Sequence, residues 1–141
     1  MSEETIFTRI IEGEIPSYTI YEDETTYAFL DANPLAPGHT LVIPKEPYER
    51  LNDMPPDVIG DVFSTAGKIA DAVEEATDAT ATTLAINNGE DAGQEVPHAH
   101  LHIVPQSSEG GPKSIHRLFD MEEVPDDEMA AIAERINEAQ Q

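Results

Sequence analysis

The stretch that decides the fold lies near residue 100 and reads His98-Ala99-His100-Leu101-His102-Ile103-Val104. Its regular alternation of polar and apolar residues is typical of a strand with one face in the core. We therefore predict a strand over 98–104 that buries Ala99, Leu101 and Ile103 and presents three imidazoles on its other face. Three of the five histidines of the chain share this face, and packing alone does not account for such a row.

Two kinds of chemistry use a row of imidazoles. Alternate residues of a strand lie ~6.6 Å apart, so two of these histidines can chelate one metal ion. The outer two are ~13 Å apart, which strains a site that uses all three, and no Asp or Glu of this strand shares their face. A neutral imidazole can instead attack phosphorus, and its ordinary pKa lies near neutral pH, where it also transfers protons. The strand alone leaves both chemistries open.

The loop over 87–97 precedes this strand and carries two glycines beside neutral amide side chains. Asn87, Gly89, Gly93 and Gln94 offer amide donors and a backbone that a ligand can approach closely, which suits phosphate oxygens. Such donors are a weak indication by themselves. Because the row of histidines follows them directly, they favour phosphoryl chemistry over metal binding.

The rest of the chain predicts an α+β fold. Its hydrophobic periodicity and capping residues predict a helix over 5–12, strands over 19–22, 26–30 and 40–43, a long helix over about 55–75, a strand over 83–86 and a helix over about 126–139. The last helix places Met129, Ile132, Ala133 and Ile136 on one face. This order predicts an antiparallel sheet rather than a doubly wound one. The 141 residues fit a single domain, with a core over about 5–105 and a C-terminal extension over 106–141.

Composition excludes several classes of function. Seven Lys and Arg stand against 29 Asp and Glu, so the clustered cations that nucleic acids require are absent, and we expect no nucleic-acid partner. No apolar run approaches the ~20 residues of a membrane span, so we expect no membrane partner. The acidic start of the chain lacks the features of a secretory signal, which predicts a cytoplasmic protein. Without cysteine there is no disulfide framework, thiolate zinc site or cysteine nucleophile.

The formal net charge of −22 also predicts an adaptation to salt. Such a charge destabilises a compact state by self-repulsion unless ions screen it, and the Debye length falls to ~3 Å at ~1 M ionic strength. We therefore expect a halophilic protein of a high-salt cytoplasm. The alternative is an ordinary acidic protein that is stable at low salt.

The loop and the histidines together resemble the motif of the histidine triad (HIT) family. The family's triad and preceding loop are similar to the segment 87–105. Its opening is similar to Ile6-Phe7 with Gly13-Glu14-Ile15-Pro16, and its central strands to Ala28-Phe29-Leu30-Asp31 and Gly38-His39-Thr40-Leu41-Val42-Ile43-Pro44-Lys45. The resemblance covers about three-quarters of the chain. It implies a HIT-like fold with one long central helix, a homodimer that extends its sheet, and hydrolysis or transfer of a nucleoside monophosphate without a cofactor.

The resemblance also implies roles for individual residues. His100 would be the nucleophile that forms a nucleotidyl-histidine, which water then resolves. His98 and His102 would orient it and contact phosphate, and His39 would complete the catalytic cluster from the neighbouring strand. Gln94 would donate to a phosphate oxygen, and Asp31 would accept from the ribose hydroxyls. The expected nucleotide-binding residues are Phe7, Ile10, Ile15, Phe29, Asp31, Ala32, Asn87, Gly93, Gln94, Glu95 and Val96. Ordinary core packing is the alternative role for the apolar residues in this set.

Two positions depart from the family's pattern. Relatives commonly have Ser or Thr after the loop glutamine, whereas this chain has Glu95, whose carboxylate would repel the substrate's phosphate. Some microbial relatives carry a zinc ion held partly by N-terminal cysteines. This chain has Phe7-Thr8-Arg9 there and no cysteine, so we predict no metal.

Three functions therefore compete. The first is an enzyme acting on purine nucleoside phosphoramidates or dinucleoside polyphosphates. The second is a nucleotide-binding regulatory protein whose turnover is incidental, and the third is a metal-binding module. A covalent adduct on His100 would favour the enzyme. Tight nucleotide binding with negligible turnover would favour the regulatory protein, and metal in the purified protein would favour the metal-binding module.

Overall fold

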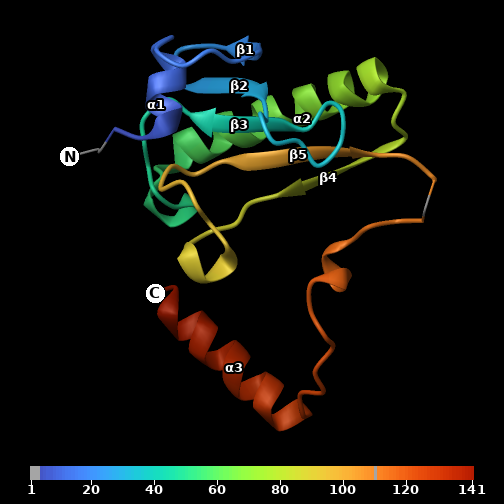
Figure 1. The fold of residues 1–141 in the computed structure, drawn as a ribbon. Coiled ribbons are helices and arrows are strands. Elements are labelled where there is room, and N and C mark those ends of the chain that lie inside the picture. The colour runs from blue at the N-terminus through green and yellow to red at the C-terminus, as the bar shows by residue number, and fades with distance from the viewer. Residues whose placement is uncertain (1–3, 110) are drawn as a thin grey trace.

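The computed structural model describes residues 4–109 and 111–141, so Met1 to Glu3 of the acidic N-terminus lie outside the described residues. Within these ranges the elements follow the predicted order (Figure 1). They are α1 (Ile6–Ile11), β1 (Thr19–Glu22), β2 (Thr26–Leu30), β3 (Thr40–Pro44), α2 (Pro56–Thr77), β4 (Ala81–Ala85), β5 (Leu101–Gln106) and α3 (Asp126–Ala139). Short 3-10 turns at Leu51–Asp53, Glu90–Ala92 and Ile115–Arg117 interrupt the loops.

The five strands form one sheet in the order β1-β2-β3-β5-β4, and every neighbouring pair is antiparallel. The predicted α+β class with an antiparallel sheet is confirmed. β5 lies between β3 and β4, with His102 opposite Leu41 on one side and Ala85 on the other. The histidine-bearing strand is therefore held by ladders on both edges, which fixes its register.

Each face of the sheet packs against a different helix (Figure 1). The α2 face is the main core, in which Val62, Ala66, Ile69 and Val73 pack with buried strand residues that include Leu101 and Ile103. On the other face Phe7 of α1 packs with Tyr27, Phe29, Leu41 and Ile43. Burying one large apolar side chain contributes about 1.5–3 kcal/mol. Because Leu101 and Ile103 point into the α2 core, the alternation along β5 turns His102 toward the opposite face of the sheet, on which α1 packs.

The strand predicted over 98–104 begins later, at Leu101, and continues to Gln106. The reason lies in the backbone before it, because the Ala99 amide donates to Tyr48 O at 2.7 Å and the His98 amide to Val96 O at 2.8 Å. These bonds replace ladder bonds to β3, whose pairing starts at Val42↔Leu101. Ala99, Leu101 and Ile103 are buried as predicted.

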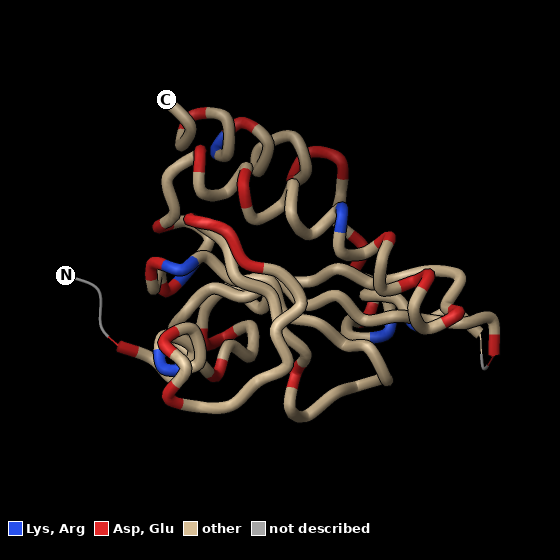
Figure 2. Tube along the Cα trace, turned by 90° about the horizontal axis from the view of Figure 1, so that it is seen from above, with Lys and Arg blue, Asp and Glu red and all other residues tan. Residues whose placement is uncertain are grey.

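Most of the C-terminal extension is exposed. The α3 bounds agree with the predicted helix, but all residues from 112 to 131 are exposed, and Met129 and Ile136 are more than half exposed. Acidic residues are spread over helices and loops, with few Lys and Arg between them (Figure 2). Within the described parts of the chain, no helix combines the length and the apolar character needed to cross a membrane.

Gly38 joins the loop after β2 to β3 and thereby sets the position of His39. Its φ of +97° lies in the left-handed region, and a Cβ there would lie 2.6 Å from Thr77 Cγ2 at the end of α2. Only glycine meets both conditions without strain. The turn that leads into the active face of β3 is therefore packed directly against the long helix.

Replacing Gly38 with Ala should lower the free energy of unfolding by about 2–4 kcal/mol, which combines left-handed strain with crowding. Urea denaturation of wild type and variant measures this loss. Gly13→Ala is the matched control, because Gly13 has a φ of +83° with nothing within 4 Å of its Cβ position. The control should lose only about 1–2 kcal/mol. Equal losses in the two variants would show that the Thr77 contact costs nothing.

Candidate active site

A cavity of about 370 Å³, here called the histidine cavity, opens beside α1 on the sheet face that carries His102. It brings together most residues that the sequence predicted for the site: Phe7, Ile10, Phe29, Asp31, Ala32, His39, Asn87, Gly93, Glu95, Val96, His100 and His102. It is also lined by four residues that the sequence analysis did not select, Ile6, Asn33, Leu35 and Leu41. Ile15, Gln94 and His98 are not part of its lining.

His100 is held in a defined orientation immediately before β5. Its Nδ1 lies 2.7 Å from the carbonyl oxygen of His98. Because a carbonyl only accepts, Nδ1 carries the proton, and in the neutral ring the lone pair is on Nε2. The Phe7 ring packs edge-on against the imidazole, with centroids 5.1 Å apart. His100 thus has one nitrogen anchored and the other available as a nucleophile.

His39 and His102 form a hydrogen-bonded pair whose protons are fixed by a backbone amide. Leu35 N donates to His39 Nδ1 at 3.0 Å, so in the neutral ring the proton of His39 lies on Nε2. That nitrogen donates to His102 Nδ1 at 2.9 Å, which leaves the His102 proton on Nε2. The Nε2 atom of His102 is buried and has no hydrogen-bond partner among the described residues. The cavity lining therefore contains an unpaired donor.

Both rings of this pair are neutral at pH 7. Burial, helped by the neighbouring His100 and His39, lowers the pKa of His102 to about 4. Burial also lowers the pKa of His39, although the Asp31 carboxylate, 3.6 Å from His39 Nε2, opposes it. The proton positions deduced from the hydrogen bonds assume neutral rings, and the lowered pKa values of His39 and His102 support that assumption.

His98 does not take the phosphate-contacting position that the resemblance implied. It is 0% exposed, its Nε2 donates to Pro44 O at 2.7 Å, and its Nδ1 accepts from the Thr5 hydroxyl at 2.9 Å. Burial lowers the pKa of His98 to about 4, so the ring is neutral and both nitrogens are engaged. Its role is to connect the start of α1 and the end of β3 to the carbonyl that orients His100.

Gln94 is likewise occupied by the protein rather than free for a phosphate oxygen. Its Nε2 donates to Glu49 O at 2.6 Å and Val96 O at 2.9 Å, and its Oε1 accepts from Gly89 N at 2.8 Å. Both amide hydrogens are used within the protein in this structure, and the donation to phosphate that the resemblance implies stays a prediction. Gln94 braces the loop that brings Gly93 and Glu95 to the cavity.

Asp31 lies nearer the histidines than the strand pattern indicated. The analysis of the strand found no carboxylate on the histidine face, but Asp31 follows β2 and reaches His39 across the sheet. One ligand atom each from Asp31, His39 and His102 lie within 4.8 Å of one another, a spacing that could hold a metal ion. The prediction of a metal-free site stays a prediction.

Comparisons with known proteins agree with this geometry. The model of the HIT domain matches residues 12–109. The chain is 40% identical over 106 residues to adenylylsulfatase HINT3 of Arabidopsis thaliana, which covers 75% of this chain and 54% of the plant protein. It thus spans about half of that relative. It is 40% identical over 104 residues to adenosine 5'-monophosphoramidase HNT1 of Saccharomyces cerevisiae, covering 74% of this chain and 63% of the yeast protein.

A solved structure extends the similarity to the whole fold. The crystal structure of a HIT family member from Bacillus subtilis superposes with a TM-score of 0.86 at 34% identity and covers 96% of each chain. This confirms the predicted HIT-like fold. The domain match, the relatives and the cavity lined by His39, His100 and His102 show that the chain belongs to the histidine triad family.

Proposed function

We propose that this protein is a nucleotide hydrolase or transferase that removes a purine nucleoside monophosphate from a phosphoramidate or a dinucleoside polyphosphate. The observation that carries the proposal is the bond from His100 Nδ1 to His98 O, which leaves the His100 Nε2 lone pair at the cavity. Family membership supports it, as do the names of two relatives, an adenylylsulfatase and a monophosphoramidase.

The reaction would proceed in two displacements at phosphorus. In the first, His100 Nε2 forms a bond to the α-phosphorus, and the bond from phosphorus to the leaving group breaks. The leaving group takes the electron pair of that bond and, where it is an amine, a proton from solvent. The His98 carbonyl stabilises the positive charge that His100 gains, because it accepts the Nδ1 proton at 2.7 Å. In the second, water attacks phosphorus, the N–P bond breaks, and the free nucleoside monophosphate and neutral His100 are regenerated.

His102 would act on the phosphate oxygens rather than on phosphorus. Its unpaired Nε2–H is a fixed, neutral donor on the cavity lining. A donor of this kind that strengthens its hydrogen bond in the transition state is typically worth about 3 kcal/mol. His39 is a positioning residue here, because with Leu35 it fixes which nitrogen of His102 carries the proton.

The nucleoside would lie against α1. Phe7, Ile10, Phe29 and Val96 give the cavity an apolar wall that suits a flat base. Asp31 would accept from the ribose hydroxyls. Its Oδ1 holds the Asn33 amide at 2.9 Å, and a carboxylate retains lone pairs for further donors.

Replacing His100 with Asn should abolish turnover of adenosine phosphoramidate and keep AMP binding. The amide retains polarity but has no lone pair able to attack phosphorus, and loss of a nucleophile typically costs several orders of magnitude. Single-turnover kinetics measure turnover, mass spectrometry detects the covalent adduct, and calorimetric titration measures AMP binding. His116→Asn, at an exposed position in the C-terminal extension, is the control and should behave like wild type. Wild-type turnover in the His100 variant would end the covalent-histidine proposal, and binding without turnover in the wild type would favour a regulatory protein.

Glu95 is exposed and lines the histidine cavity. A second negative charge near the substrate's phosphate costs more here than in bulk water, because screening is weaker in a partly desolvated site. Glu95→Ser should therefore raise kcat/KM for adenosine phosphoramidate about tenfold, or ~1.4 kcal/mol. Glu90→Ser changes the same charge in the same loop outside this cavity and should have little effect. An unchanged kcat/KM for Glu95→Ser at low and high salt would identify Glu95 as surface charge.

We also propose a homodimer adapted to a high-salt cytoplasm. β1 and β4 are the edges of the sheet, and each exposes an apolar side chain, Ile20 (43%) and Leu84 (42%). Pairing such edges across two subunits protects them, but a charge of −22 on each chain opposes it unless salt screens the repulsion. Across a salt series, sedimentation should give a dimer at several molar salt, and the melting temperature should rise with salt. A monomer at high salt contradicts the first proposal, and a constant melting temperature contradicts the second.

A further inference from the structure

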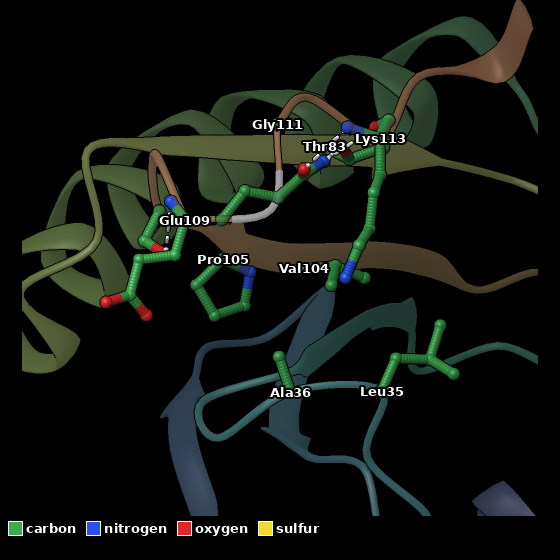
Figure 3. A pocket seen from close by; sticks show the side chains of 10 residues that line it. Leu35, Ala36, Thr83, Val104, Pro105, Glu109, Gly111 and Lys113 are labelled. Atoms are coloured by element: carbon green, nitrogen blue, oxygen red, sulfur yellow. Dashed lines mark hydrogen bonds between the residues drawn. The ribbon is translucent and has the colours of Figure 1, made fainter.

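A second cavity, of about 480 Å³, is lined by residues of β4, β5 and the segments beside them (Figure 3). His102 lines the first cavity and Val104 the second, and alternate strand residues share a face ~6.6 Å apart. Leu35 lines both cavities. The two cavities therefore share Leu35 as a boundary, which places the second cavity next to a molecule bound at the histidines.

The segment after β5 folds back to form one wall of this second cavity, and Gln106 holds it there. The Gln106 Nε2 donates to Lys113 O at 2.8 Å, and Lys113 N donates to Gln106 Oε1 at 3.1 Å. The same amide also bonds the Thr83 hydroxyl on β4. This reciprocal pair fixes the Lys113 backbone against the sheet, so the lysine is a positioned group rather than part of a free loop.

The Lys113 side chain extends along the cavity toward Val104 and Leu35, at the boundary with the histidine cavity (Figure 3). No ion pair of Lys113 is found among the residues that the structure describes, whereas Lys45 pairs with Glu22 at 2.7 Å. Glu109 also lines the cavity, but at its opposite end (Figure 3). In a chain with seven Lys and Arg against 29 acidic residues, an unpaired cation beside the active site provides local attraction for an anion.

We propose that Lys113 and this second cavity bind an additional anionic group, a phosphate or sulfate, of the nucleotide held in the histidine cavity. The inference rests on the proposed function and deepens it, because it makes Lys113 a specificity-determining residue. An ammonium donates up to three charge-assisted hydrogen bonds to such oxygens. The group has two possible sources, an anionic leaving group beyond the α-phosphate or a phosphate on the ribose.

Three substrates with the same adenylyl group separate these sources. Adenosine phosphoramidate has an uncharged leaving group, adenylyl sulfate has an anionic one, and 3'-phosphorylated adenosine phosphoramidate carries its extra anion on the ribose. Lys113→Ala should lower kcat/KM about five- to tenfold for one of the two substrates with the extra anion, and less than twofold for the plain phosphoramidate. The substrate that loses rate identifies the source.

Three further variants test whether the loss reflects charge at this position. Lys113→Arg should retain most of the wild-type preference for the substrate with the extra anion over the plain phosphoramidate. Glu109→Gln should raise this preference modestly, because it removes a repulsive charge from the cavity. Lys68→Ala, on the exposed face of α2, removes the same charge elsewhere and should change nothing. All measurements are made at the lowest salt at which circular dichroism shows folded protein, because salt screens an exposed cation.

The outcomes distinguish this inference from the proposed function. If Lys113→Ala leaves all three kcat/KM values unchanged, or lowers them equally, the inference is wrong and the proposed function stands. If the wild type hydrolyses neither these three substrates nor a diadenosine polyphosphate, the proposed function fails. Calorimetric affinities for AMP, adenylyl sulfate and adenosine 3',5'-bisphosphate then decide the inference. A wild-type preference for an extra anion that Lys113→Ala removes supports it, and affinities that do not depend on Lys113 overturn it.

Discussion

The hydrogen bond from His100 Nδ1 to the His98 carbonyl depends on contacts well beyond the two residues it joins. Since His98 is bonded through its ring to Thr5 and Pro44, the carbonyl is fixed relative to both α1 and β3. The Thr5 hydroxyl that donates to His98 also accepts the amides of Phe7 and Thr8 as the cap of α1. Helix capping, the wall of the base cavity and the orientation of the nucleophile therefore belong to one hydrogen-bonded unit.

Burial, rather than the charge of the chain, controls the protonation of the histidines that support the site. A net charge of −22 attracts protons and by itself raises a histidine pKa, but exposed charges more than ~10 Å away are largely screened at ~0.1 M salt. Burial is not screened by salt in this way, and it lowers the pKa values of His98 and His102 to about 4. The neutral arrangement with the unpaired proton on His102 Nε2 is therefore favoured at pH 7, even in so acidic a protein.

Local sequence patterns predicted the elements and the face that each residue occupies, but not the partners of polar side chains. The bounds of β1, β2 and α3 agree because the polar turn at Asp23-Glu24 that separates the two strands and the helical periodicity of α3 are local features. The resemblance implied phosphate contacts for His98 and Gln94, yet in this structure they bond Pro44 and Glu49, which lie 54 and 45 residues away. Asp31 lines the cavity as the sequence predicted, and its role toward the ribose stays a prediction. Its approach to His39 depends on two strand ends meeting.

β5 carries His102, Val104 and Gln106 on one face, so it connects the histidine cavity with the second cavity. These three residues alternate with the buried Leu101, Ile103 and Pro105. A slip of one residue would therefore turn His102, Val104 and Gln106 into the core together. The ladders to β3 and β4 prevent that slip. His100 precedes the ladder and depends on the His98 carbonyl instead. The proposed nucleophile is therefore oriented by a single local bond, while the groups proposed to recognise the substrate's anions are fixed by the sheet.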